Sequence, residues 1–592
     1  MEQRTKPKPN IPKWSRWLAA VCLAAAAFAV LKNIAYPLLW NDEGETAMFA
    51  ERVLDYGYPK VSDGKNVVYY LELKDKMAGR RTPDGAYLGS GWGHFYWGTI
   101  GALAARAADG VAGARGADLY LKTALLRLPF ALAGLAAILL AIIAVAPLLM
   151  GGNSGGAGGS PARIWLFAAA VFAWQSLSVS WALHMREMRY YALVCLLLSW
   201  LLYLTVRRHT GRMRAGRYAV LTTAALVLLL VTFPPAMAGA AGALGLTEVV
   251  LFVRKRDIRK ALAGIVPLAA AGAAGIVYAG VFRSLRIAAG FAELFPRTPA
   301  RTREAVVKIF AFFRDYESLW VIAAALGLGS VVAGVSWIRA RRGGRLAPGT
   351  AREHGGLLLM SRADRGLVGL SVLVAVYILI HAAVFIMASF PFPFERYFIW
   401  LQPAAGLVLW LNLFALGGTL KTLPDKWARR GARAALAGGF ILLATLTAGE
   451  RVPVLRARVY ELFHRYIGPV DYVVGFIRRQ YPDTSRLVVA TNYEEGVLQY
   501  YLGSRVIIGF VGNNLKEDMK LTPDVIVGRK RSAYTNRNIL ELMERARYKQ
   551  KTIWIHDTII NNIPEVMPGF NSHRYRTERT DNERWALKIL YK

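Results

Sequence analysis

Long apolar runs recur along the whole chain, and they limit what it can fold into. A run of about 18 or more apolar residues is long enough to cross the hydrocarbon core of a bilayer as a helix. The stretch 218–253 is too long for one span, and we interpret it as two spans because Phe233-Pro234-Pro235 interrupts it and proline breaks a helix. Nine further runs have the length of a single span: residues 17–40, 128–150, 164–183, 190–206, 261–282, 319–338, 366–389, 397–420 and 434–449. The sequence therefore predicts a mainly α polytopic membrane protein with about 11 transmembrane helices.

Composition and charge agree with this prediction. Of the 592 residues, 55% are hydrophobic and the mean hydropathy is +0.31, which is rare for a soluble chain of this length. The net charge is +35, but Lys and Arg recur in short clusters between apolar runs instead of forming one basic face. We therefore expect no nucleic-acid partner. Cys22 and Cys195 both fall in apolar runs and suit neither a metal site nor a disulfide framework.

The basic clusters also give the spans a direction, because positively charged loops are retained on the cytoplasmic side of a membrane. Five segments on one side of the predicted membrane hold five to seven Lys or Arg residues each: residues 1–16, 207–217, 254–260, 339–365 and 417–433. We therefore expect the N-terminus in the cytoplasm. An odd number of spans then places the C-terminus outside.

Three segments fall on the outer side of this prediction. The first is the long loop 41–127, in which residues 91–107 are semi-apolar and expected in the membrane interface. The second contains residues 303–313, which have the pattern of a surface amphipathic helix. The third follows the transmembrane module, residues 1–450, and comprises residues 451–592.

Residues 451–592 have no long apolar run and read as a small soluble α/β domain. Helical patterns at 493–502 and 537–548 fall between short β-rich stretches, which favours a mixed or parallel sheet. The stretches are residues 486–490, 505–509, 524–528 and 552–556. The sequence here contains no Gly-rich phosphate loop, and we interpret the domain as a lid or an acceptor-recognition module.

An acidic segment opens the first outer loop directly after the first span. Asp42, Glu43 and Glu45 stand at the start of a helical pattern that Gly57 and Pro59 close. In the structural interpretation, Asp42 caps the helix and Glu45, three residues on, returns the hydrogen bond. In the functional interpretation, Asp42 lies at the membrane boundary beside an apolar cavity and acts as a general base toward a hydroxyl group. Pattern alone favours the structural interpretation.

The order of four motifs resembles that of the GT-C glycosyltransferases. The Asp42-Glu43 pair, followed by a helix of the Ala-x-x-Ala type, looks like their first outer loop. More narrowly, the chain resembles the bacterial protein-mannosyltransferase-like and aminoarabinose-transferase-like enzymes of glycosyltransferase families 39 and 83. Residues 91–97 (GWGHFYW) stand where that group has a His- or Lys-Pro-Pro-Leu-Tyr-Tyr motif, and residues 186–193 (REMRYYAL) are similar to its Glu-Ala-Arg-x-Tyr-Ala-Leu stretch.

The fourth motif is residues 395–397 (ERY), followed by Pro403, which looks like the family's Arg-Tyr-then-Pro start of a late span. The resemblance covers residues 15–450. One departure is that Phe95-Tyr96 replaces the family's Pro-Pro pair, so the backbone after the histidine differs there.

The resemblance implies a GT-C fold and a sugar donor linked to polyprenyl phosphate, met at the outer face of a cell inner membrane. The acceptor would be a lipid, a glycan or a protein. Asp42 would be the base that activates the acceptor for direct displacement at the anomeric carbon, and Glu43 would assist by hydrogen bonding. The scheme requires no metal ion or other cofactor, and it leaves a divalent metal open.

The leaving group in this scheme is a lipid phosphate, whose developing charge fixed cations would stabilise. Arg189 and Arg396 are the candidates, because a guanidinium group binds phosphate through two donors. His94 would hydrogen-bond the same phosphate, and Tyr191 and Tyr397 would contact the substrate. The alternative for the two arginines and the histidine is an ordinary position in the membrane interface.

Two other function classes stay open. A transporter or flippase of lipid-linked sugars predicts inverted repeats and ionisable residues buried along several spans. The sequence has no obvious internal repeat, its acidic residues gather at the outer boundary, and His381, within a span, is expected to form structural hydrogen bonds. The third class is a membrane scaffold whose C-terminal domain recruits partners.

Overall fold

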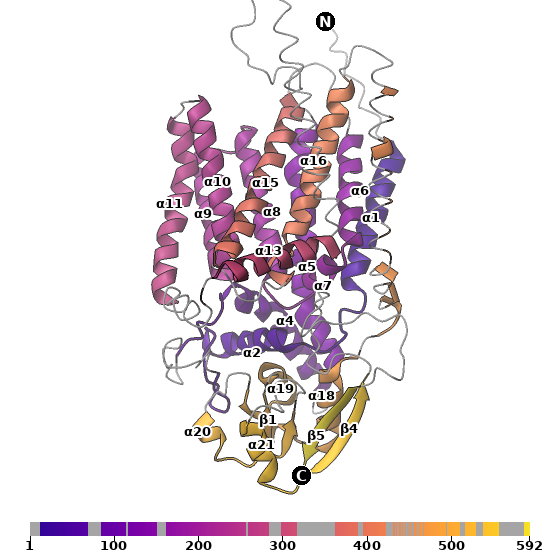
Figure 1. Ribbon diagram of the computed structural model, residues 1–592, viewed down its shortest axis with the longest axis vertical. Coiled ribbons are helices and arrows are strands. Elements are labelled where there is room, and N and C mark those ends of the chain that lie inside the picture. The colour runs from indigo at the N-terminus through magenta and orange to yellow at the C-terminus, as the bar shows by residue number, and fades with distance from the viewer. Residues whose placement is uncertain are drawn as a thin grey trace, which may run out of the picture.

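The computed structural model consists of a tall helical bundle with a smaller sheet-containing part at one end (Figure 1). It describes residues 12–68, 85–113, 116–150, 161–255, 258–282, 296, 298–315, 362–388, 395–421, 467–492, 494–509, 515–528, 537–555 and 585–592, with scattered positions between 430 and 465. The chain starts at one end of the bundle and finishes at the other, beside the sheet.

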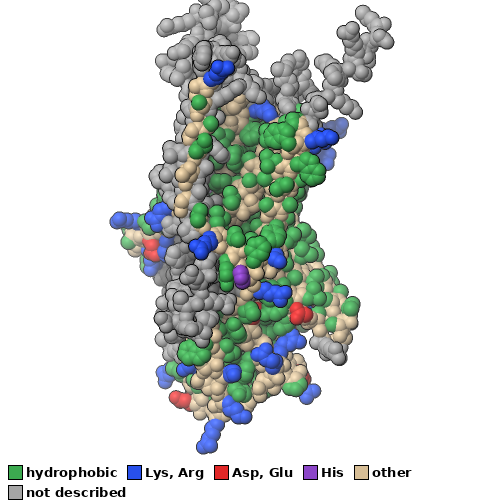
Figure 2. All heavy atoms as spheres, turned by 90° about the vertical axis from the view of Figure 1, so that its right-hand side faces the viewer, with side chains coloured by type: hydrophobic (Ala, Val, Ile, Leu, Met, Phe, Trp, Pro, Cys, Tyr) green, Lys and Arg blue, Asp and Glu red, His purple; other side chains and the backbone are tan. Residues whose placement is uncertain are grey.

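Nine helices run along the described part of the bundle: α1 (Lys13–Leu31), α5 (Leu119–Leu149), α6 (Ala162–Leu177), α8 (Tyr191–His209), α9 (Ala215–Thr232), α10 (Pro234–Lys255), α11 (Ile258–Val281), α15 (Arg362–Ala388) and α16 (Leu401–Lys421). Seven helices of the described chain are long and apolar enough to cross a membrane, or eight if a bent pair counts as one span. On the face shown in Figure 2, apolar side chains cover much of the described bundle surface. The protein is therefore a mainly helical, multi-pass membrane protein.

The predicted spans overlap these helices, and one of them is bent. The predicted span 164–183 is broken at Ser178: α6 ends at Leu177, and the chain bends by 86° into α7 (Val179–Met185). The bend forms because Ser178 is extended and its side chain caps α7 by accepting a hydrogen bond from the Trp181 backbone. The break at Phe233 falls where it was predicted, with α10 starting at Pro234. The predicted span 319–338 lies outside the described residues, and 434–449 is described only at scattered positions.

Three further helices lie across the bundle axis. Both α2 (Asn41–Tyr56) and α4 (Gly93–Ala112) lie between the bundle and the sheet, in the predicted first outer loop. Helix α13 (Pro299–Asp315) lies across the bundle and includes the segment predicted to be amphipathic. The loop and the C-terminal sheet therefore share one end of the molecule.

The sheet has five strands in the order β2-β1-β3-β5-β4: β1 (Val488–Thr491), β2 (Arg505–Ile508), β3 (Val525–Val527), β4 (Lys549–Ile555) and β5 (Trp585–Tyr591). Strand β1 pairs in parallel with β2 and β3, and β5 pairs antiparallel with β3 and β4, so the predicted mixed sheet is confirmed. The parallel strands are short and mostly apolar, as expected for strands buried on both faces. The prediction missed β5.

Four helices accompany the strands: α18 (Pro469–Gln480), α19 (Glu495–Leu502), α20 (Leu515–Asp518) and α21 (Arg537–Glu544). Helix α19 connects β1 to β2 and ends at Gly503, whose positive φ of 60° is the left-handed conformation that glycine tolerates. It crosses α2 at very short range, because a Cβ atom built on Gly496 would lie 2.7 Å from the backbone nitrogen of Glu45. Two glycines, Gly44 and Gly496, permit this crossing.

Hydrogen bonds also join the sheet part to the first span and its loop. Asp471 in α18 accepts from the backbone of Leu38 at 3.1 Å, and the Tyr501 hydroxyl in α19 accepts from the backbone of Leu39 at 3.2 Å. Asn66 donates to the carbonyl of Ser504 at 3.1 Å and accepts from the β2 backbone at 2.8 Å. The acidic start of α2 is therefore held from both the bundle and the sheet.

Candidate functional site

The start of α2 differs from the predicted capping box. The helix begins at Asn41 with Trp40 as the N-cap, and Glu43 returns the hydrogen bond by accepting from the Trp40 backbone at 3.3 Å. The prediction that Asp42 caps the helix with Glu45 as its partner is wrong, because the helix starts before Asp42 instead of after it. Asp42 is therefore a first-turn residue whose carboxylate is available for other contacts, at the end of the helix where the dipole favours negative charge.

Glu43 is fully buried and its carboxylate is occupied by structural partners. Arg127 of α5 donates to both of its oxygens, at 2.8 and 2.6 Å. The backbone of Met188 donates to Oε1 at 2.9 Å. The remaining donor groups of Arg127 bind the carbonyls of Ile34 and Pro37. This paired network fixes the end of the first span, α2, α5 and the segment before α8 against one another.

Asp42 lies beside two arginines from distant parts of the chain. Its Oδ2 is 3.5 Å from Nη2 of Arg189 and 3.9 Å from Nη2 of Arg396. The Asp42 side chain keeps 22% of its surface exposed, against 9% for Arg189 and 11% for Arg396. The structure thus brings three predicted site residues together, with the Asp42 carboxylate the most exposed of the three.

Arg189 lies in the turn between α7 and α8 and is the centre of the cluster. Its Nη1 donates to the Asp42 carbonyl at 3.1 Å and to the Thr46 hydroxyl at 3.2 Å, and its guanidinium group lies 5.5 Å from the ring centre of Tyr190. Burial by itself would lower the pKa of Arg189, but the carboxylates of Asp42 and Glu45 raise it above its ordinary value. The guanidinium group therefore remains charged at every physiological pH.

Glu45 is a member of the cluster that the sequence analysis did not assign to the site. Its Oε1 lies 3.7 Å from Nη1 of Arg189 and accepts a hydrogen bond from the Tyr87 hydroxyl at 3.1 Å. Burial raises the pKa of Glu45 to about 7, with Arg189 opposing this rise and Asp42 adding to it. Glu45 is three residues after Asp42, a helical spacing that places both carboxylates on one face of α2 and could have indicated its membership of the site.

His94 lies at the start of α4 and is fully buried. Its Nε2 is 3.5 Å from Nη1 of Arg189, and its Nδ1 has no hydrogen-bond partner among the described residues. Burial, reinforced by Arg189, lowers the pKa of His94 well below its ordinary value, so the imidazole is neutral. Because Arg189 can only donate, Nε2 accepts and Nδ1 carries the proton.

Two glycines explain how the His94 segment reaches the cluster. A Cβ atom on Gly91 would lie 2.4 Å from the carbonyl oxygen of Val231, and one on Gly93 would lie 2.2 Å from the Thr232 hydroxyl. The segment therefore packs directly on the last turn of α9, an approach that only glycine permits.

Arg396 and Tyr397 form a short 3-10 turn, η2 (Glu395–Tyr397), before α16. The guanidinium group of Arg396 lies 5.2 Å from the ring centre of Trp40 and 5.7 Å from that of Tyr397. Tyr397 in turn stacks with Phe233 and Phe385, at 6.1 and 5.7 Å between ring centres. Aromatic rings thus hold Arg396 against the end of the first span.

Tyr191 lies away from the carboxylates of the cluster. It is the first residue of α8 and is fully buried, with its ring 4.6 Å from that of Tyr190 and 5.3 Å from that of His184. Its hydroxyl has no hydrogen-bond partner among the described residues. Among the seven predicted site residues, Glu43 has a carboxylate that structural donors already saturate.

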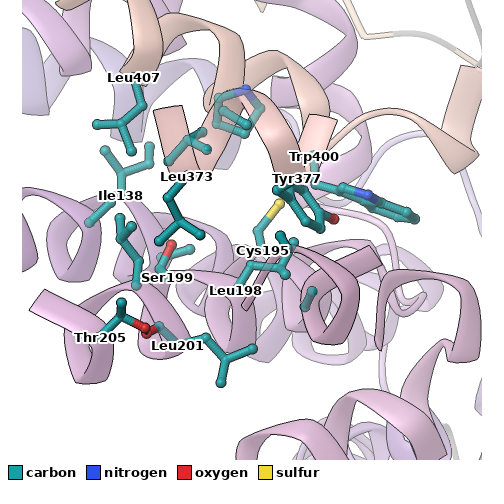
Figure 3. A pocket seen from close by; sticks show the side chains of 18 of the residues that line it. Ile138, Cys195, Leu198, Ser199, Leu201, Thr205, Leu373, Tyr377, Trp400 and Leu407 are labelled. Atoms are coloured by element: carbon teal, nitrogen blue, oxygen red, sulfur yellow. The ribbon is translucent and has the colours of Figure 1, made fainter. Parts of the chain in front are cut away.

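An apolar cavity lies within the bundle (Figure 3). It has about 920 Å³ of empty space, counting its opening, and is lined mainly by apolar side chains of α5, α6, α8, α10, α15 and α16. Trp400 and Tyr377 line its wall, and Trp400 also packs on Phe233, which stacks with Tyr397. His381, as predicted, is a structural residue here: its Nε2 accepts from the Trp400 indole at 3.1 Å.

The cluster contains two carboxylates, two guanidinium groups and a neutral imidazole. Within the described ranges, no group of three or more His, Cys, Asp or Glu residues is placed to hold a metal ion. The arrangement can bind an anionic phosphate through the arginines, and it can accept a proton at Asp42.

Comparisons with known proteins found similarity in structure but not in sequence. No family model matches the sequence, and no curated protein matches it. Among solved structures, the chain is similar to an oligosaccharyltransferase from Archaeoglobus fulgidus, crystallised with a tethered acceptor peptide. The TM-score is 0.45 at 10% identity, over 91% of this chain and 69% of that chain. A likeness at this level carries no argument about activity.

Proposed function

We propose that the protein is a membrane glycosyltransferase that transfers a sugar from a polyprenyl-phosphate donor to an acceptor hydroxyl group. The observation that carries the proposal is the placement of Asp42 beside Arg189 and Arg396, together with an apolar cavity in the bundle. A base, two phosphate-binding cations and an apolar space are the parts that this reaction needs. The motif resemblance to GT-C enzymes supports the same reaction class.

The two arginines bind the phosphate of the donor in this proposal. Each guanidinium group presents a planar fork of donors that matches phosphate oxygens, and both lie where little water reaches. Charge builds on the leaving phosphate oxygen as the bond to the sugar breaks. Fixed cations in a site with little water stabilise that charge more strongly than water would. The apolar cavity beside Trp400 receives the isoprenoid units nearest the phosphate.

Asp42 acts as the base. Its carboxylate accepts the proton of the acceptor hydroxyl while the hydroxyl oxygen forms a bond to the anomeric carbon. The bond from that carbon to the phosphate oxygen breaks, and the phosphate leaves with the electron pair as free polyprenyl phosphate. The proton then passes from Asp42 to water. A single displacement of this kind inverts the configuration of the anomeric carbon.

Neighbouring residues support this step without taking part in proton transfer. We assign Glu43 a positioning role, because its carboxylate is saturated by Arg127 and backbone donors. His94 donates from Nδ1 to a phosphate or sugar oxygen, consistent with a neutral imidazole whose other nitrogen faces Arg189. Tyr397 shapes the aromatic wall beside Arg396.

The cluster is proposed to face the outside of the cell membrane, with the N-terminus in the cytoplasm. The support is the basic loop 207–217, which follows α8 at the end of the bundle away from α2, α4 and the sheet. Residues 451–592 then form an extracytoplasmic domain, and its crossing with α2 suits a role in presenting the acceptor to Asp42.

The test is donor turnover by the full-length protein in detergent micelles. The protein is given polyprenyl-phosphate-linked hexoses or pentoses with a membrane extract as acceptor, and release of free polyprenyl phosphate is measured. We expect Asp42→Asn to lower kcat by about 10²–10⁴-fold. The matched control is Asp55→Asn, on the same helix but in an exposed pair with Arg106, which should keep wild-type turnover. Full turnover by Asp42→Asn would overturn the base assignment, and no turnover by the wild type with any donor would favour a transporter or scaffold.

A further inference from the structure

A basic pocket lies at the end of the bundle opposite the Asp42 cluster. It is formed where the last turn of α8 meets the first turns of α9, and it has about 1080 Å³ of empty space, counting its opening. Four arginines line it: Arg207, Arg212, Arg214 and Arg217. Arg207 is 18 residues after Arg189, which along a helix corresponds to about 27 Å, so the pocket is separate from the proposed active site.

The four arginines have no acidic partners within the described part of the chain. Among the described residues, none of their guanidinium groups forms an ion pair with a carboxylate, and Nε of Arg207 is buried without a hydrogen-bond partner. The neighbouring Arg208 provides a contrast. Its guanidinium group is paired with Glu248 of α10, with contacts of 2.5 and 3.0 Å. Four positive charges around one hollow favour the binding of an anion from outside the chain.

Aromatic and apolar side chains complete the pocket. Trp200 and Tyr203 line it from α8, and the guanidinium group of Arg207 lies 5.8 Å from the ring centre of Tyr203. Trp and Tyr side chains are typical of the level of lipid headgroups. Leu221 lines the pocket from α9, and the exposed Leu228, seven residues on, lies on the same helical face. An apolar track thus leads from the basic pocket along the lipid-facing surface of α9.

We propose that this pocket binds the headgroup of an anionic phospholipid, with a preference for one that carries two phosphates. The guanidinium groups hold the phosphate oxygens, the aromatic rings contact the glycerol backbone, and an acyl chain follows α9 past Leu228. Basic pockets between transmembrane helices recognise such headgroups in this way. A free inorganic anion would use the arginines alone and leave the aromatic rings and the apolar track without a role. The alternative is that the arginines only orient the protein in the membrane, and this role would require neither a pocket nor a preference for one lipid.

The experiment is native mass spectrometry of the full-length protein with defined lipids. The lipids are diphosphatidylglycerol, phosphatidylglycerol and phosphatidylethanolamine, and inorganic phosphate serves as a soluble competitor. We expect affinity to fall in that order of lipids. We expect Arg207→Gln combined with Arg214→Gln to weaken diphosphatidylglycerol binding by at least about 10-fold. The control is Arg479→Gln combined with Arg486→Gln, which removes two exposed charges from the sheet part and should not change binding.

A second pair of substitutions distinguishes binding that uses the aromatic lining of the pocket from binding by positive charge alone. Trp200→Leu combined with Tyr203→Leu keeps all four arginines and should still weaken binding several-fold. Equal binding of the anionic and the zwitterionic lipids would overturn the proposal, as would equal losses in the arginine variant and its control. Displacement of the lipid by millimolar phosphate would assign the pocket to a free anion instead. Thermal unfolding of each variant, unchanged from wild type, excludes a folding defect as the cause.

Discussion

Two neighbouring carboxylates on α2 have opposite surroundings. Glu43 is fully buried and receives four hydrogen bonds, including two from Arg127 at 2.8 and 2.6 Å. Asp42, one residue earlier, is partly exposed and lies 3.5 and 3.9 Å from Arg189 and Arg396. Because successive residues on a helix point about 100° apart, adjacent positions reach different environments.

Glu43 and Arg127 form a structural ion pair, whereas Asp42 belongs to a cluster that we propose is reactive. A carboxylate whose lone pairs are all used cannot accept a proton or orient a substrate without breaking the fold. Asp42 has no contact with Arg189 or Arg396 shorter than 3.5 Å, and its carboxylate is partly exposed, so it can exchange these partners for a substrate group without breaking a buried ion pair. The Asp42-Glu43 pair therefore combines one residue that holds the site and one that we propose acts in it.

The largest expected effect comes from breaking the buried ion pair between Glu43 and Arg127. Arg127→Ala should lower the free energy of unfolding by about 3–5 kcal/mol, because it leaves the Glu43 carboxylate buried without its partner. Chemical unfolding in micelles measures this change. The control is Arg106→Ala, which breaks a pair that is 41% exposed on the arginine side and should cost about 1 kcal/mol or less. Equal losses in the two variants would remove the distinction between buried and exposed pairs.

The next effect tests whether the sheet part positions α2. Gly496→Ala inserts a methyl group against the backbone of Glu45, and we expect this overpacking to cost about 1–3 kcal/mol and to lower turnover. The matched control is Gly475→Ala in α18, where the added atom would meet only the end of the Arg479 side chain at 3.5 Å. Unchanged turnover in Gly496→Ala would show that α2 does not depend on α19 for its position.

A smaller effect, on turnover, is expected from substituting an arginine of the Asp42 cluster. Arg396→Lys keeps the charge but loses the planar fork, so kcat/KM should fall about 10-fold, or about 1.4 kcal/mol in transition-state stabilisation. Thermal unfolding should stay near that of the wild type. Steady-state kinetics with the donor lipid measure the change. A large loss of stability with normal turnover would instead make Arg396 a structural residue like Arg127.

The last effect concerns Glu45 and the pH dependence of stability. Its folded-state pKa is raised to about 7, so the folded protein binds a proton more tightly than the unfolded chain does. The contribution of Glu45 to stability is therefore complete below its ordinary pKa and is lost as pH rises to about 7. Glu45→Gln should remove this loss. The melting temperature of the variant minus that of the wild type should therefore increase between pH 5 and pH 8. A constant difference across this range would mean that Glu45 has an ordinary pKa.

Sequence reasoning reached the parts of the fold that depend on local pattern. The length of the apolar runs predicted the spans, Phe233-Pro234 predicted the break between α9 and α10, and β-rich stretches predicted four strands. It missed β5, and it placed the cap at Asp42 instead of Trp40. The cap depends on which side chain reaches the Trp40 backbone, and Glu43 is fixed there by Arg127, 84 residues away.

The candidate site was predictable to a similar degree. Motif order indicated that Asp42, His94, Arg189 and Arg396 belong together, and the structure places them in one cluster. The role of Glu45 was not predictable, because its raised pKa depends on burial by segments distant in sequence. The basic pocket was visible only as a charged loop, since its aromatic lining depends on how α8 meets α9.

The most direct test of the proposed function is an experimental structure of the full-length protein with bound polyprenyl phosphate. We predict density for the phosphate within hydrogen-bond distance of the guanidinium groups of Arg189 and Arg396, with the first isoprenoid units entering the cavity beside Trp400. The Asp42 carboxylate should face the position of the sugar. Phosphate density at the Arg207 pocket with the Asp42 cluster empty would contradict the proposal.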